Sequence, residues 1–164
     1  MSQRIVIDSL GFAREARSLQ GELPIDNLTR TLDMLASSVG YLTYRVEGRM
    51  GGRNRPQLLL QIEGVLSVCC QRCLEGIDYP LKVRSVLEFV GDEVDLTQEE
   101  IEDDSKDFLP AQNEIDVVAL IEDEVILNLP PAPRHESCAL PNSGQGTGKI
   151  SPFSVLNGFK SKAQ

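Results

Sequence analysis

Apolar and polar residues alternate with a period of two in two long stretches of the chain, and this pattern predicts β-strands. In residues 42–47, Leu42, Tyr44 and Val46 alternate with polar neighbours. Residues 80–90 repeat the pattern and offer one apolar face to a core, formed by Leu81, Val83, Leu87 and Phe89. Short connections between such strands favour an antiparallel sheet over parallel winding.

Shorter segments are also predicted to be strands. Residues 4–7 predict a short strand, and residues 57–62 form a hairpin with residues 42–47 across the loop sequence GGRNRP. Gly64 interrupts the pattern before a further short strand at residues 65–68. The prediction is a meander of hairpins.

Helical spacing of apolar residues appears in other segments. Residues 10–19 form an amphipathic stretch. Residues 24–38 predict a helix of about three turns from three leucines at helical spacing, Leu28, Leu32 and Leu35. Residues 152–159 predict one or two last turns with three apolar positions, Phe153, Leu156 and Phe159.

The strongest helix prediction covers residues 115–129. Its apolar positions recur at helical spacing, at Val118, Ile121, Val125 and Leu129. We expect Asp116, Asp123 and Glu124 on the opposite, solvent-facing side. Glu122 intrudes on the apolar stripe, so its charge must sit at the edge of the stripe or find a partner. Prolines directly after this segment end the helix.

These elements predict an α+β fold: an antiparallel sheet of hairpins with two or three flanking helices, in a single domain over residues 1–164. The 164 residues are 41% hydrophobic and 25% charged, as in one globular domain. No apolar run approaches the roughly 20 residues that span a bilayer, and the N-terminus lacks a signal-peptide pattern. We therefore expect a cytoplasmic protein without membrane contact.

The formal net charge of −9 is concentrated in one segment. Residues 91–115 hold ten acids and one lysine, which is again −9, so the remaining 15 acids and 15 bases cancel. Because like charges repel, we expect a mobile acidic insertion at about residues 91–114. The alternative is a docking strip for a basic partner such as a ribosomal protein. Residues 139–151 are rich in glycine and predict a flexible linker.

A modest basic patch lies in the predicted hairpin, at Arg45, Arg49, Arg53 and Arg55. Only Glu47 opposes these arginines. They are candidate RNA contacts, because clustered arginines attract phosphate groups. A solvated hairpin tip is the alternative. The acidic balance of the whole chain argues against general binding to a phosphate backbone, and we expect no DNA partner.

The cysteines and the only histidine carry the candidate chemistry. Cys70 and Cys73 follow a predicted strand with two intervening residues, and His135 and Cys138 follow the proline loop with the same spacing. Three thiolates and one imidazole form a possible tetrahedral zinc set, which leaves Cys69 spare. The alternatives are small buried cysteines with one exposed histidine, or a disulfide, which a reducing compartment disfavours. A redox motif needs a helix N-terminus, whereas this one joins two strands.

No catalytic set emerges from the remaining residues. A Cys-His hydrolase would use His135 as base, but no elbow or oxyanion-hole pattern accompanies any cysteine. The sequence GQGTGK near Gly144 fails as a phosphate loop, because Ile150 stands where Ser or Thr binds magnesium. Consecutive carboxylates at residues 122–124 point in different directions on a helix. We therefore expect a protein that is not an enzyme.

Four ordered motifs carry a resemblance to one bacterial family. They are L-x-x-x-C-Q-R-C-L at residues 66–74, IDVVALIEDEVILNLP at 115–130, P-x-P-R-H-x-x-C at 131–138 and SPFSVLNGFK at 151–160. In this order they are similar to the YceD family of large ribosomal RNA subunit accumulation proteins, and the likeness covers nearly the whole chain. Some relatives have a more cysteine-rich C-terminal region, so a four-ligand metal site here depends on His135.

The resemblance implies a role in the synthesis, processing or stability of 23S rRNA, without an established enzymatic activity. A non-enzymatic assembly factor would bind a precursor of the large subunit, either its 23S rRNA through the arginines or a basic ribosomal protein through the acidic segment. One alternative is a zinc-stabilised adaptor that touches only protein. The other is an rRNA-processing enzyme, which needs positioned carboxylates with magnesium.

Overall fold

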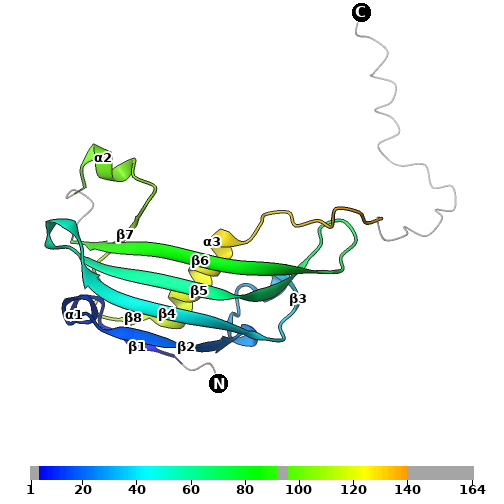
Figure 1. Cartoon of the computed structure of the whole chain (residues 1–164), viewed down its shortest axis with the longest axis horizontal. Coiled ribbons are helices and arrows are strands. Elements are labelled where there is room, and N and C mark those ends of the chain that lie inside the picture. The colour runs from blue at the N-terminus through cyan, green and yellow to red at the C-terminus, as the bar shows by residue number, and fades with distance from the viewer. Residues whose placement is uncertain (1–3, 92–95, 140–164) are drawn as a thin grey trace, which may run out of the picture.

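A central sheet organises the molecule, and the computed structural model describes it within residues 4–91 and 96–139 (Figure 1). Its strand order is β2-β4-β5-β6-β7, and β3 pairs with β5 near the far end of that strand. The strands are β2 (Ser18–Pro24), β3 (Leu35–Ser37), β4 (Tyr41–Met50), β5 (Pro56–Cys69), β6 (Gly76–Val90) and β7 (Asp107–Pro110). A second, two-stranded sheet pairs β1 (Val6–Ile7) with β8 (Ile115–Asp116). With its helices, this is the predicted α+β fold in a single domain.

The predicted alternation places the core on one face of the central sheet. Leu42, Tyr44 and Val46 of β4 are buried, as the period of two requires. The core-facing positions predicted in β6 are buried too, namely Leu81, Val83, Leu87 and Phe89. Helix α3 (Val117–Asn128) packs against this face (Figure 1). Burial of this aliphatic surface is the main favourable contribution to folding.

Strand β5 runs without interruption through Gly64, which corrects the predicted break at this position. Leu42 of β4 and Leu81 of β6 stand opposite the glycine in the ladder. A Cβ atom at Gly64 would lie 2.5 Å from Leu42 Cδ2 and 3.1 Å from the backbone oxygen of Tyr41. The glycine therefore allows a close approach of β4 and does not mark a turn.

Part of the acidic segment adds a parallel strand, which the antiparallel prediction did not include. β7 pairs with β6 in parallel, with Leu109 opposite Phe89. A parallel pair needs a crossover connection, and the connection here includes the short helix α2 (Gln98–Ile101). The described part of the segment thus has regular structure, and its mobility stays a prediction.

The predicted helix at residues 24–38 is wrong. Two single 3-10 turns stand there, η1 (Ile25–Asn27) and η2 (Leu32–Met34), before β3. The Glu122 side chain of α3 accepts hydrogen bonds from the backbone N–H groups of Arg30 and Thr31. Because a distant carboxylate satisfies these donors, the backbone has no need to continue a helix between the two turns.

The amphipathic stretch predicted at residues 10–19 divides between a helix and a strand. Helix α1 (Ser9–Arg14) starts after Asp8, whose side chain accepts hydrogen bonds from two N–H groups of the first turn. Ala16 has a φ of 49°, in the left-handed region, so the helix cannot continue through it. The last two residues of the stretch, Ser18 and Leu19, belong to β2.

Helix α3 confirms the strongest helix prediction, and the side chain of Asp116 caps its N-terminus. The predicted apolar positions are all buried, at Val118, Ile121, Val125 and Leu129. Glu122 is buried and has the partner that its charge requires, because Arg30 Nε donates to it at 2.9 Å. Glu124 was expected to face solvent, which is wrong: it is 5% exposed and accepts a hydrogen bond from Ser85 Oγ. Burial raises the pKa of this carboxyl.

Two predictions lie outside the described residues. They are the linker at residues 139–151, of which only residue 139 is described, and the helical turns at residues 152–159. Among the residues that the structure describes, no helix is long and apolar enough to cross a membrane.

Candidate functional site

The turn between β5 and β6 holds two of the candidate metal ligands, Cys70 and Cys73. The turn closes with a hydrogen bond from the N–H of Cys70 to the carbonyl of Glu75 at 2.8 Å. Leu74 has a φ of 65°, which turns the chain back toward β6. The N–H of Arg72 donates to Sγ of Cys70 at 3.4 Å. The turn therefore brings both sulfur atoms into one group.

The loop after α3 supplies the other two candidate ligands. This loop runs beside the turn, and the N–H of Gln71 donates to the carbonyl of Pro133 at 2.8 Å. Arg72 Nη1 donates to the carbonyl of Cys138 at 3.3 Å. These contacts hold His135 and Cys138 against the cysteine turn, although more than 60 residues separate the two segments.

The spacing of the four ligand atoms fits a tetrahedral zinc site. Sγ of Cys70 lies 3.8 Å from Sγ of Cys138, and Sγ of Cys73 lies 3.3 Å from Nδ1 of His135. All four ligand atoms lie within 4.8 Å of one another. Zinc–sulfur bonds of about 2.3 Å in a tetrahedron place the sulfur atoms about 3.8 Å apart. We call these four residues the Cys3His group.

The imidazole of His135 is oriented by the backbone. Its Nε2 lies 3.2 Å from the carbonyl oxygen of Gly76 at the start of β6. Because a carbonyl only accepts hydrogen bonds, Nε2 is the donor in this contact, and Nδ1 is the ring nitrogen that faces Sγ of Cys73. Metal-binding histidines are held by this kind of backbone contact.

The thiols of the turn have shifted pKa values. Burial raises the pKa of Cys70, but backbone N–H donors from the turn and the loop outweigh it and lower the pKa to about 5. The pKa of Cys73 is raised. A backbone hydrogen bond from Glu75 lowers it, but burial and the neighbouring thiols of Cys70 and Cys138 together raise it by more. A bound cation would favour the thiolate form of every cysteine in the group.

Cys69 is not a member of the Cys3His group, as the spacing predicted. Its Sγ donates to the carbonyl of Leu74 at 3.6 Å. The cysteine turn joins β5 to β6, so it lacks the helix N-terminus that stabilises a redox-active thiolate. Three sulfur ligands and one imidazole favour zinc over hard cations such as magnesium.

The four arginines predicted to contact RNA lie in two places. Arg45 lies in the middle of β4 and forms an ion pair with Glu47 at 2.6 Å. Arg49, Arg53 and Arg55 lie at the end of the hairpin between β4 and β5, which we call the hairpin end. The structure therefore brings three of the four arginines together.

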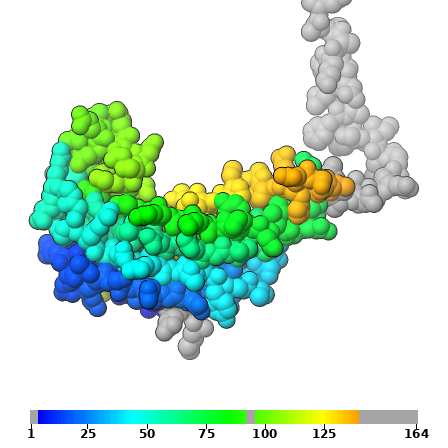
Figure 2. All heavy atoms as spheres, viewed as in Figure 1, coloured from blue at the N-terminus to red at the C-terminus, as the bar shows by residue number. Residues whose placement is uncertain are grey.

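Acidic residues of the same chain contact the arginines of the hairpin end, whose loop includes η3 (Gly52–Asn54). Glu100 of α2 accepts from Arg53 Nη1 at 3.1 Å and from Arg55 Nη1 at 2.9 Å. Buried Glu88 of β6 lies 3.4 Å from Arg55 Nη1 and 3.5 Å from Lys106 Nζ. Figure 2 shows the segment around α2 standing at one end of the molecule, opposite the loop after α3.

Sequence reasoning missed Gln57 and Glu88, which lie at the base of this network. Gln57 Nε2 donates to Glu88, and Gln57 Oε1 accepts from Arg49 Nε at 3.0 Å. The two residues are 4% and 2% exposed. Gln57 stands directly opposite Glu88 in the ladder of β5 and β6, so a correct register would have identified the pair.

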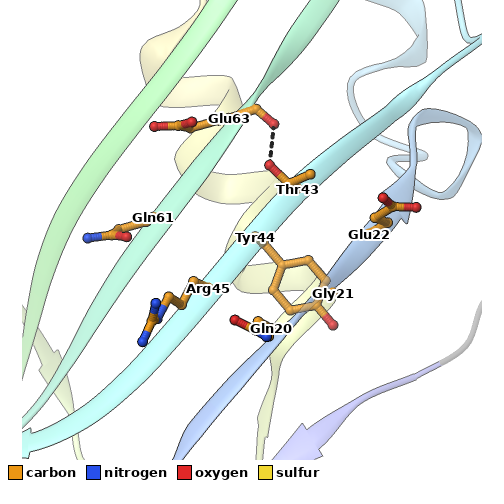
Figure 3. A pocket seen from close by; sticks show the side chains of 8 residues that line it. All are labelled: Gln20, Gly21, Glu22, Thr43, Tyr44, Arg45, Gln61 and Glu63. Atoms are coloured by element: carbon orange, nitrogen blue, oxygen red, sulfur yellow. Dashed lines mark hydrogen bonds between the residues drawn. The ribbon is translucent and has the colours of Figure 1, made fainter.

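A hollow of about 500 Å³ lies on the sheet face opposite α3 (Figure 3). Its lining comes from three adjacent strands, with the side chains of Gln20, Glu22, Thr43, Arg45, Gln61 and Glu63 among those drawn. Thr43 Oγ1 donates to the carbonyl of Glu63 at 3.1 Å. Arg45 is the predicted contact residue that lines it, and Glu47 already neutralises this arginine. Because the lining also holds the acids Glu22 and Glu63, the hollow offers no excess of positive charge to a phosphate group.

Comparison with known proteins gave one family. The family model described as "Large ribosomal RNA subunit accumulation protein YceD" matches residues 58–160, which is more than half of the chain. Neither the curated proteins nor the solved structures include a match. The matched range contains the Cys3His group, Glu88 and Glu100, and it begins after the four arginines.

Proposed function

The chain belongs to the YceD family of large ribosomal RNA subunit accumulation proteins, and we propose that it is a non-enzymatic ribosome biogenesis factor acting on 23S rRNA synthesis, processing or stability. The family match over residues 58–160 carries this proposal. The protein acts in the cytoplasm, where it binds a precursor of the large subunit. A factor that binds an assembly intermediate stabilises it by mass action and needs no reacting centre.

The acidic residues nearest to the arginines support a binding role. A magnesium-dependent nuclease needs carboxylates that are free to hold metal ions. Glu88 and Glu100 instead contact arginine and lysine side chains of the same chain. These contacts favour the assembly factor over the rRNA-processing enzyme.

The Cys3His group holds a structural zinc ion in this proposal. Cys70, Cys73, His135 and Cys138 would supply all four ligands, so the ion would have no open position for a substrate. The ion would join the turn between β5 and β6 to the loop after α3. Its role would be to stabilise this end of the sheet, in the assembly factor as well as in the alternative protein-binding adaptor.

The precursor subunit is contacted through the hairpin end in this proposal. Arg49, Arg53 and Arg55 suit the phosphates of 23S rRNA, and the acidic residues of α2 suit a basic ribosomal protein.

A deletion strain tests the proposed function. We expect mature 23S rRNA to fall relative to 16S rRNA, most strongly at low growth temperature, and the wild-type gene to restore the ratio. Unchanged rRNA ratios and ribosome profiles in the deletion strain would contradict the role in biogenesis.

Incubation of the purified protein with precursor rRNA and magnesium tests the non-enzymatic part separately. We expect the RNA to comigrate with the protein without being cut. Cleavage that is lost when the protein is heat-denatured would favour the processing enzyme instead.

A further inference from the structure

Two arginines of the hairpin end converge on one carboxylate, that of Glu100. Arg53 and Arg55 each donate from Nη1 to a different oxygen of this group. Phosphate and carboxylate present similar oxygen pairs to guanidinium groups. The carboxylate of Glu100 therefore occupies a position in which these arginines would also bind a phosphate.

Helix α2, which carries Glu100, lies outside the core, and its segment is attached to the sheet farther along the chain, by the Lys106–Glu88 pair and by β7. No residue of α2 is buried, and its apolar residue Ile101 is 61% exposed. The remaining hydrogen bonds of the Glu100 carboxylate go to the N–H and hydroxyl of Thr97, within the same segment. The pair of Glu100 with Arg53 is partly exposed, so it is weak and is screened by salt, whereas the pair with Arg55 is shielded, at 20% and 14% exposure of the two side chains. A polyanion that binds Arg53 first can therefore compete with the carboxylate for both arginines.

Arg53 and Arg55 differ in the exposed fraction of their side chains. The side chain of Arg53 is 57% exposed, whereas that of Arg55 is only 14% exposed and lies between Glu100 and Glu88. Glu88 belongs to β6 and stays with the sheet if α2 moves. Displacement of α2 would therefore uncover Arg55 while Glu88 still orients it.

The segment also has the charge of a polyanion. Residues 96–107 hold one lysine against six acids, which are Glu99, Glu100, Glu102, Asp103, Asp104 and Asp107. A nucleic acid strand binds proteins mainly through its repeated negative charges. The acidic segment and an RNA strand are therefore attracted to the arginines of the hairpin end by the same kind of electrostatic interaction.

We propose that α2 occupies an RNA-phosphate site at the hairpin end of the free protein, and that precursor rRNA binds by displacing Glu100 from Arg53 and Arg55. This inference rests on the proposed function, from which it takes rRNA as the partner. The acidic segment acts as an intramolecular competitor. This competition weakens the binding of RNA that presents few phosphates. A large rRNA precursor presents many phosphates and still binds.

Glu100→Gln tests this competition. Glutamine at the third position of a helix keeps the capping box, so α2 retains its start while the attraction to the arginines falls. Glu102→Gln is the matched control, because Glu102 loses the same charge in the same segment and contacts Gln98. Binding is measured by fluorescence anisotropy of a labelled single-stranded RNA of mixed sequence, about 20 nucleotides long, at low salt.

We expect Glu100→Gln to tighten RNA binding about threefold to tenfold, and Glu102→Gln to change it by less than about twofold. Adding Arg53→Gln to Glu100→Gln should remove the gain. Thermal unfolding curves check that all variants are folded. Equal effects of the two glutamine variants, weaker binding by Glu100→Gln, or no RNA binding by any variant would overturn the inference.

The deletion strain and the binding measurement together distinguish a failure of this inference from a failure of the proposed function. Reduced 23S rRNA in the deletion strain together with unchanged affinity of Glu100→Gln overturns only the competition. A normal 23S ratio together with tighter binding by Glu100→Gln contradicts the role in biogenesis and supports the competition for RNA.

Discussion

The two ends of the central sheet are held by different chemistry. At one end, the turn between β5 and β6 meets the loop after α3, and the four ligand atoms of the Cys3His group lie within 4.8 Å of one another. At the hairpin end, α2 meets the loop between β4 and β5 through ion pairs of Glu100 with Arg53 and Arg55. Both contacts join segments that are far apart in the sequence.

The difference lies in what can replace each contact. The four ligands of the Cys3His group would close around a metal ion, whereas a partly exposed ion pair such as that of Glu100 with Arg53 exchanges more readily with salt or with another anion. With a metal ion bound, the Cys3His end would be suited to stability, and the hairpin end is suited to exchange of partners. Within the hairpin end, buried Glu88 is suited to stability and Glu100 to exchange.

The largest expected effect is at the Cys3His end. Cys73→Ser removes one of four ligands, so zinc content should fall from near one per chain, and the melting temperature should drop by about 10–15 °C. Metal analysis and differential scanning calorimetry measure the two changes on the same sample. A chelator should lower the melting temperature of the wild type in the same direction.

Cys69→Ser is the control, because Cys69 is adjacent in sequence and lies outside the Cys3His group. We expect it to keep its zinc and to shift the melting temperature by less than about 3 °C. Similar losses in both variants, or a wild type that contains no zinc after expression with zinc supplied, would contradict the metal site.

The next effect is at the buried layer of the hairpin end. Glu88→Ala removes the acceptor that Arg55, Gln57 and Lys106 share. A partly buried arginine left without this carboxylate should lower the free energy of unfolding by about 2–4 kcal/mol, measured by urea denaturation.

Glu63→Ala provides the comparison for this layer. Glu63 pairs with Lys82 at 3.2 Å on the surface, where its side chain is 60% exposed, so the loss should be below about 1 kcal/mol. Equal losses for the two variants would mean that the Glu88 network is no stronger than a surface ion pair.

Local patterns predicted the strands well and one helix poorly, for physical reasons. Alternating burial is a local property, so β4 and the core-facing side of β6 follow from their own residues. The leucines of residues 24–38 satisfy helical spacing equally well, but the loop between η1 and η2 is set by Glu122, which is 92 residues from Arg30. Tertiary hydrogen bonds of this kind have no signature in a single segment.

The candidate site divides in the same way. The Cys3His ligands were predicted because each pair lies within a short motif, while their proximity required the fold. The contacts of the arginines could not be predicted, because Glu88 and Glu100 lie 33 and 45 residues from Arg55. Charge composition showed that an acidic segment exists, but it did not show that the segment lies on the hairpin end.

The smallest expected effect is at Glu100 itself. Hydrogen bonds from Thr97, together with the charges of Arg53 and Arg55, lower the pKa of this carboxyl below its ordinary value. A carboxyl with a lowered pKa in the folded state stabilises the protein above its unfolded pKa of about 4.3, and this stabilisation is lost as the pH falls through the folded pKa. Glu100→Gln should therefore melt slightly below the wild type at pH 7, and the difference should shrink as the pH falls through the lowered pKa of Glu100.

Salt separates the arginines from the capping box in this last comparison. Glutamine keeps the geometry of the capping box but not its charge, so the difference at pH 7 reflects the hydrogen bonds from Thr97 as well as the pairs with Arg53 and Arg55. About 1 M sodium chloride should reduce the difference by the part that comes from the arginines, because the Debye length then falls to about 3 Å. Thermal unfolding at low and high salt measures the change. A difference of the same size at low and high salt would mean that the ion pairs with Arg53 and Arg55 contribute nothing to it, and would contradict the contrast between the two ends of the sheet.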